Sequence, residues 1–168
     1  MFVIVMGVSG SGKNTVGELL AERLNCPFYD GDNFHPPANI AKMSAGVPLD
    51  DEDRQGWLAA LAALIDRGLQ LGECGVIACS ALKQKYRDYL AVDPQRVHFV
   101  YLKGSYDLIW ERMSHRQGHY MKAGMLESQF KSLEEPADAL TVDITQTPQQ
   151  IADAVLAQLL SGGAGKLA

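Results

Sequence analysis

The sequence lacks both a long apolar run and an excess of positive charge. Its first apolar stretch, Phe2–Met6, is far too short to cross a bilayer, and no basic segment precedes it as in a secretory signal. The formal net charge of −5 argues against an extended surface for nucleic acid or membrane, although it leaves room for a local basic pocket. We therefore expect small-molecule partners, with no nucleic acid and no membrane.

Cysteine is also scarce. The three cysteines, Cys26, Cys74 and Cys79, show no spacing typical of metal ligands, and the sequence shows no internal repeat. Their odd number, together with the missing secretory signal, favours a reducing cytoplasm as the location. At 168 residues, of which 47% are hydrophobic and 21% charged, the chain has the composition of one ordinary globular domain.

The most informative stretch is the N-terminal segment MFVIVMGVSGSGKNT. Residues 2–6 predict a buried strand, the segment GVSGSGK fits the pattern G-x-x-x-x-G-K, and a helical pattern follows over 16–24. In this order the three parts form a phosphate site, where backbone N–H groups surround phosphate oxygens and Lys13 supplies a mobile charge. Together they favour a nucleotide site over a plain glycine-rich turn. Its candidate residues are Gly7, Val8, Ser9, Gly10, Ser11, Gly12, Lys13, Asn14 and Thr15.

One position departs from the phosphate-site pattern. The residue after the lysine is normally Ser or Thr, whose hydroxyl binds Mg²⁺, but here it is Asn14. Asn14 can offer a carbonyl oxygen on a longer side chain, whereas Thr15 is rotated by about 100° around the helix. We therefore expect an intact nucleotide pocket with a weakened metal site at Asn14, and Thr15 near the α-phosphate.

Apolar strands alternate with helical patterns along the whole chain. Further strands are expected over 28–29, 74–80, 97–102 and 139–144, and further helices over 38–44, 57–70, 83–91, 106–115, 126–133 and 148–160. Residues 50–54 predict an acidic helix start ahead of the 57–70 helix. The alternation is typical of α/β proteins in which helices cover both faces of a parallel sheet, in three α/β/α layers, with the ligand at the carboxyl ends of the strands.

Two carboxylates follow the expected 28–29 strand. Asp30 and Asp32 are two residues apart, so their side chains share one face in an extended chain. Next to a phosphate site, Asp30 can support Mg²⁺ and Asp32 can accept a proton from an attacking hydroxyl. The alternative is a solvated turn, which Asp-Gly-Asp also favours. Beside the phosphate site formed by the glycine-rich loop, the catalytic interpretation is the stronger one.

Longer motifs resemble those of one family. The stretch DGDNFHPPANIAKMSAGVPLDDEDRQGWL, taken with GVSGSGK, CSALKQKYRD, YLKGSYDLIWERMSHRQGHYM, LEEP and VDI, is similar to the small P-loop gluconokinases over residues 1–160. The resemblance implies a P-loop kinase fold like that of shikimate kinase, with a single domain over 1–160 and a mobile lid at about 114–126. The tail at 161–168 is expected to be mobile. The resemblance also implies phosphorylation of D-gluconate to 6-phospho-D-gluconate with ATP and Mg²⁺, a substrate that composition and periodicity do not indicate.

A gluconate site needs a cation for the carboxylate, hydrogen-bonding groups for the hydroxyls and a base near the terminal hydroxyl. Asp32 is the expected base, and His35 is the expected hydrogen-bond donor. Suitable side chains for the remaining contacts are Asn39, Lys42, Arg54, Arg87 and, in the lid, His119. The cations also have other interpretations: Lys42 as an exposed helix residue, Arg54 paired with the acidic run 50–53, and Arg87 paired with Asp88 or a helix end.

Basic residues continue beyond the expected 106–115 helix. By the resemblance, Arg112 packs on adenine, and Arg116 approaches the phosphates when the lid closes and excludes water. For His119 and Lys122, a solvated basic loop is the alternative. The residues after the last strand, Gln146, Thr147 and Pro148, suit edge contacts with adenine. The expected catalytic residues are Lys13, Asp32 and Arg116.

The helix expected over 57–70 is strongly apolar. Its side chains are expected in the core or at a subunit interface, and they make a homodimer the expected assembly. The residues concerned are Trp57, Leu58, Leu61, Leu64 and Ile65.

Two competing functions stay open at this point. The first is a kinase for another small hydroxy acid such as shikimate, or for a nucleotide, on the same fold. The second is a nucleotide-binding regulator whose turnover is impaired by Asn14.

Overall fold

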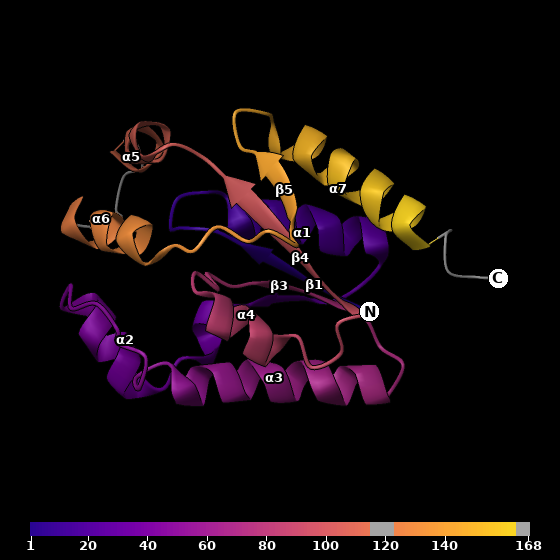
Figure 1. Ribbon diagram of the computed structural model, residues 1–168, viewed down its shortest axis with the longest axis horizontal. Helices are drawn as coiled ribbons and strands as arrows, with labels where there is room; N and C mark the ends of the chain where they lie inside the picture. Colours follow the sequence, from indigo (N-terminus) through magenta and orange to yellow (C-terminus); the bar gives the residue numbers. More distant parts are fainter. Residues whose placement is uncertain (115–122, 164–168) are drawn as a thin grey trace.

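The computed structural model describes residues 1–114 and 123–163 (Figure 1). Within this part, the sheet has five parallel strands in the order β2-β3-β1-β4-β5. The strands are β1 Phe2–Met6, β2 Phe28–Asp30, β3 Gly75–Ala78, β4 Val97–Lys103 and β5 Leu140–Asp143. This confirms the α/β class and the parallel sheet expected from the alternating pattern.

Helices cover both faces of this sheet. They are α1 Lys13–Leu24, α2 Pro37–Ser44, α3 Gln55–Gln70, α4 Gln84–Leu90, α5 Tyr106–Ser114, α6 Ala123–Ser132 and α7 Pro148–Gly163, and a 3₁₀ turn spans Gly31–Phe34. In Figure 1, α1 and α7 lie on one side of the strands, and α3 and α4 lie on the other. The strand arrows point toward the end of the molecule where α2, α5 and α6 gather. The carboxyl ends of the strands, where the ligand is expected, therefore lie at that end.

The central strand β1 separates two hydrophobic cores. Its Val3 and Val5 pack with α1, α5 and α7, whereas its Phe2, Ile4 and Met6 pack with α3 and α4. Successive side chains of a strand point to opposite faces, so a strand buried on both sides must be apolar throughout. This explains the unbroken apolar run that precedes the P-loop.

Two helix starts differ from the sequence-based expectation. Helix α1 begins at Lys13 rather than at residue 16, because the glycine-rich loop leads directly into its first turn. The acidic helix start expected over 50–54 precedes the helix rather than belonging to it, since residues 51–54 form turns and α3 begins at Gln55. Asp50 and Asp53 each accept a hydrogen bond from the other's backbone N–H. Such a reciprocal pair three residues apart is the pattern of a capping box, here in the turn just before the helix.

The apolar stripe of α3 faces the sheet. Trp57, Leu61 and Ile65 are fully buried in the core. Of the two placements considered for this helix, the core is therefore the one observed.

The structure pairs Cys26 with Cys74 in a disulfide and leaves Cys79 free and buried. The bridge joins the chain just before β2 to the chain just before β3. The cysteine count did not indicate this pair, because the partners are 48 residues apart and meet only through the sheet order. Among the described residues, no helix combines the length and apolarity needed to cross a membrane.

Candidate active site

The loop between β1 and α1 has the geometry of a phosphate cradle. Gly12 adopts φ 95° immediately before α1, and open space lies where a side chain would stand. Gly10 adopts φ 80°, and a Cβ there would come within 2.7 Å of Met113. Left-handed backbone and this close approach both require glycine. The pattern read from the sequence thus corresponds to a loop whose concave side is open.

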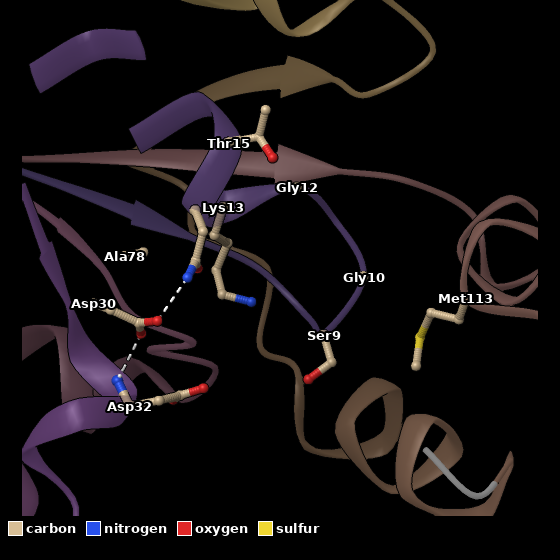
Figure 2. Close-up of a pocket in the computed structure, with 10 residues that line it drawn as sticks. Ser9, Gly10, Gly12, Lys13, Thr15, Asp30, Asp32, Ala78 and Met113 are labelled. Atoms are coloured by element: carbon tan, nitrogen blue, oxygen red, sulfur yellow. Dashed lines mark hydrogen bonds between the residues drawn. The ribbon is translucent and has the colours of Figure 1, made fainter. Parts of the chain in front are cut away.

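A pocket of about 380 Å³ opens over this loop (Figure 2). The side chain of Lys13 extends into it, and its Nζ donates a 3.0 Å hydrogen bond to the Val8 carbonyl. Burial lowers the pKa of Lys13 from its ordinary value, and the carboxylates of Asp32 and Asp30 oppose this shift. The lining residues are Ser9, Gly10, Gly12, Lys13, Asn14, Thr15, Asp30, Asp32, Ala78 and Met113.

Asp30 is held by two hydrogen bonds at the floor of this pocket. Its Oδ2 accepts from the Asn14 amide across 2.7 Å, and its Oδ1 accepts from the Asp32 backbone N–H across 3.0 Å. Strand β2 ends at Asp30, and the 3₁₀ turn begins at Gly31, so the two carboxylates do not share a strand face as expected. Both still line the pocket, because the turn folds back over the strand end. Thr15 lies on the opposite side of the α1 start from Asp30 (Figure 2).

A second pocket of about 280 Å³ adjoins the first. The two pockets share Ser9, Lys13 and Asp32, so the lysine and this carboxylate stand where they meet. The second pocket is further lined by His35, Met43, Pro48, Leu49, Arg54, Ser80, Leu82, Met125, Ser128, Gln129 and Ser132. Six of these eleven side chains are polar, so the pocket can offer hydrogen bonds to a ligand.

His35 is neutral and presents one defined proton. Its ring stacks on Trp57 with centroids 4.5 Å apart, and burial lowers its pKa below the ordinary value of 6.5. The Asn39 amide nitrogen donates to the Asp53 carbonyl at 2.7 Å, which fixes the orientation of that amide, and it also lies 3.3 Å from His35 Nδ1. Nδ1 is therefore the acceptor and Nε2 carries the hydrogen. That Nε2 lies 3.9 Å from Asp32 Oδ1.

Arg54 lines the second pocket, together with Lys13. Its Nη2 donates to the Leu49 carbonyl at 3.3 Å. The acidic run is occupied by other partners, since Asp53 pairs with Lys42 and Asp51 accepts from Lys83, Lys85 and Tyr86. The pairing of Arg54 with residues 50–53, considered above, is thus not observed.

Three other substrate candidates take supporting positions instead. Lys42 reaches Asp53 at 2.6 Å and is half exposed, and Asn39 lies buried beneath His35. The buried guanidinium of Arg87 donates to the carbonyls of Ala81 and Leu82 at 3.0 and 3.1 Å. Ala81 has φ 42°, so Arg87 stabilises a strained loop behind the pocket. None of these three side chains is among the lining residues of the second pocket, and their contact with substrate stays a prediction.

A third pocket lies beside the P-loop, and its lining includes Arg112, Gln146 and Pro148. The guanidinium of Arg112 is fixed by a hydrogen bond to the Ile144 carbonyl. Thr147 is not among the lining residues, and its backbone N–H and hydroxyl bond the Gln150 side chain at the start of α7. Three of the residues that the sequence analysis assigned to adenine thus line one pocket.

Some residues expected at the site fall outside the described part of the chain, and helix α6 contributes residues that the sequence analysis did not expect. Arg116, His119 and Lys122 lie outside the described residues, as does most of the expected lid. Sequence reasoning missed the contribution of α6 to the second pocket, namely Met125, Ser128, Gln129 and Ser132. Their spacing follows one helix face, but nothing local indicates what that face meets.

The comparisons with known proteins agree over most of the chain. The family model for shikimate kinase matches residues 9–160. The chain is 45% identical to the thermosensitive gluconokinase of Escherichia coli K12, covering 92% of this chain and 87% of that protein. It is 43% identical to the gluconokinase of Gluconobacter oxydans 621H, covering 95% and 89%.

Solved structures lead to the same family. The crystal structure of a gluconokinase from Sinorhizobium meliloti 1021 is 43% identical and superposes with a TM-score of 0.90, covering 99% of this chain and 97% of that one. Shikimate kinase from Aquifex aeolicus, 19% identical with a TM-score of 0.63, shares the fold. The chain belongs to the gluconokinase family, within the P-loop kinases that share the shikimate kinase fold.

Proposed function

We propose that this protein is a gluconokinase that transfers the γ-phosphoryl group of ATP to the 6-hydroxyl of D-gluconate. The observation that carries the proposal is the meeting of the phosphate pocket and the polar second pocket at Lys13 and Asp32. A donor in the first pocket and an acceptor in the second would face each other at that point. The relatives named above supply the identity of the acceptor.

The nucleotide would occupy the P-loop and the third pocket. Backbone N–H groups of the loop and the N-terminus of α1 bind the phosphates, and Lys13 supports the charge that moves onto the β–γ bridge oxygen. Arg112, Gln146 and Pro148 would contact the adenine. We further propose that Arg116 approaches the phosphates and that His119 contributes to the substrate site, within one kinase domain over 1–160.

Asp32 is the proposed base. Its side chain is 77% exposed at the junction of the pockets. As the gluconate O6 forms its bond to phosphorus and the bond to the ADP oxygen breaks, the O6 proton passes to the Asp32 carboxylate. His35 Nε2–H, facing the same space, would orient a substrate oxygen, and Arg54 would bind the gluconate carboxylate.

Magnesium is the proposed cofactor. Among the described residues, no group of three His, Cys, Asp or Glu side chains could hold a metal ion by itself. Mg²⁺ does not need such a group, because it keeps waters and binds through one or two protein oxygens plus substrate phosphates. Asp30 and the Asn14 carbonyl oxygen would support it, and the ion would neutralise charge on the phosphates.

Two further expectations remain proposals. We propose a homodimer, which the molar mass in solution would test, and a cytoplasmic location. The Cys26–Cys74 disulfide argues against this location, because disulfides are rare in the cytosol.

The proposed activity is tested by ADP release with Mg-ATP and a panel of gluconate, shikimate and nucleoside monophosphates. We expect turnover with gluconate far above the others. Turnover with shikimate or a nucleotide instead would reassign the substrate. ATP binding without turnover on any of them would favour the regulator.

A further inference from the structure

Gln129 of α6 holds Ser9 of the P-loop with both ends of its amide. Its Oε1 accepts from the Ser9 backbone N–H at 2.7 Å, and its Nε2 donates to Ser9 Oγ at 3.0 Å. The two residues are 120 positions apart and both are partly buried. Such a paired contact restrains both the backbone and the side chain of Ser9.

Ser9 lies where this contact can affect both the phosphate pocket and the second pocket. It lines both the phosphate pocket and the second pocket, next to Gly10, where a Cβ would come within 2.7 Å of Met113. With the Ser9 N–H bonded to Gln129, that N–H is not directed at phosphate. Because Oγ accepts from Gln129, its own hydrogen is left to donate elsewhere, and Ser9 lines both pockets.

We propose that Gln129 is a positioning residue for phosphoryl transfer, which locks Ser9 so that its hydroxyl donates into the junction where the phosphoryl group passes. The proposal rests on the gluconate kinase activity proposed above and adds a residue to it. A hydrogen bond that is in place before reaction contributes most where charge develops. The expected signature is therefore a loss of turnover rather than of binding.

The fold of α6 does not depend on this contact alone. Leu126 of the same helix is fully buried in the core that includes Ile109 and Met113 of α5. A variant at Gln129 should therefore retain the helix in place. Gln129→Met keeps the length of the side chain and removes both hydrogen-bonding functions, which makes it the preferred change.

The experiment is a double-mutant cycle on Ser9→Ala and Gln129→Met, measuring kcat and KM for gluconate and for ATP. We expect Gln129→Met to lower kcat on the order of tenfold with little change in either KM. Combined with Ser9→Ala, it should lower kcat no further than Ser9→Ala alone. Lys131→Ala is the matched control, because this α6 side chain is 74% exposed, pairs with Glu127 and is expected to leave kcat unchanged.

Three results would overturn the proposal: an unchanged kcat in Gln129→Met, kcat losses that multiply in the double variant, or a rise in gluconate KM alone, which would make Gln129 a substrate contact. Melting temperatures of all variants report on folding. The rate of ATP hydrolysis without gluconate provides a second readout of the same loop. If the wild-type protein hydrolyses ATP but leaves gluconate unphosphorylated, the proposed substrate fails, while the cycle measured on hydrolysis still decides the role of Gln129.

Discussion

The Asn14 amide donates a 2.7 Å hydrogen bond to the Asp30 carboxylate, at the position where P-loop proteins usually place a hydroxyl on Mg²⁺. The amide nitrogen faces the acid, so only the carbonyl oxygen of Asn14 is left for a cation. The bond also occupies the Asp30 oxygen that is not held by Asp32. This hydrogen bond supports the prediction of a weakened metal site, which the structure does not test.

Replacing Asn14 tests this relationship. Asn14→Ser shortens the side chain, frees Asp30 Oδ2 and supplies a hydroxyl. We expect turnover at limiting Mg²⁺ to rise on the order of tenfold, with the gain shrinking as Mg²⁺ becomes saturating. Activity is titrated against free Mg²⁺ in both proteins. Superimposable curves would show that Asn14 does not limit the metal site.

Lys13 should be needed for turnover but not for folding. Its one described side-chain hydrogen bond goes to the carbonyl of Val8, and the Lys13 side chain belongs to neither hydrophobic core, so Lys13→Met removes little from the core. Turnover should fall by at least about 100-fold, because the ammonium acts where charge develops on the phosphates. The melting temperature should change by only a few degrees. Near wild-type turnover would refute the phosphate-site assignment.

Asp32→Asn keeps the shape of the proposed base and removes its charge. We expect kcat to fall about 100-fold, in the range lost when a general base is removed. The KM for gluconate should change less, since the amide can still bond a hydroxyl. If KM rises strongly while kcat is preserved, Asp32 anchors the substrate and another group accepts the proton.

His35 should make the protein less stable in mild acid. Burial against Trp57 holds its pKa below 6.5, with Asp32 opposing and Arg54 adding to the shift. Below about pH 6.5 the unfolded chain binds a proton that the folded protein excludes, so the free energy of unfolding falls as the pH drops. Urea unfolding between pH 5 and 7.5 measures this slope.

The control for this pH dependence is His35→Gln, which should flatten part of the slope. His98 contributes in the same direction, because burial also lowers its pKa. The remaining slope should therefore be reduced by His98→Gln. An unchanged slope in both variants would show that neither histidine is buried as a neutral group.

Reduction of the Cys26–Cys74 bridge should destabilise the protein. The bridge restricts the unfolded chain over a separation of 48 residues, so opening it should lower the free energy of unfolding by about 2–4 kcal/mol. Unfolding by urea is compared with and without dithiothreitol. The double variant Cys26→Ser/Cys74→Ser should have the same free energy of unfolding as the reduced protein, and dithiothreitol should not change it. Equal stability in all samples would mean that the bridge does not form in solution.

The sequence by itself determined the class of fold and the phosphate site. An apolar run, a glycine-rich loop, a lysine and a helix are consecutive along the chain, and steric rules acting over a few residues are enough to shape them. The same holds for the alternation of strands and helices and for the placement of Asp30 and Asp32 at a strand end. These features needed no knowledge of distant contacts.

Only the tertiary structure decided which distant side chains meet. The strand order β2-β3-β1-β4-β5 brings Cys26 to Cys74, and the packing of α6 brings Gln129 to Ser9. The sequence analysis proposed Arg87 as a cation for the substrate, whereas the fold buries its guanidinium against the carbonyls of Ala81 and Leu82. Local patterns specify backbone geometry, whereas the partner of a polar side chain depends on where burial leaves an unsatisfied group, and that is set by the assembled fold.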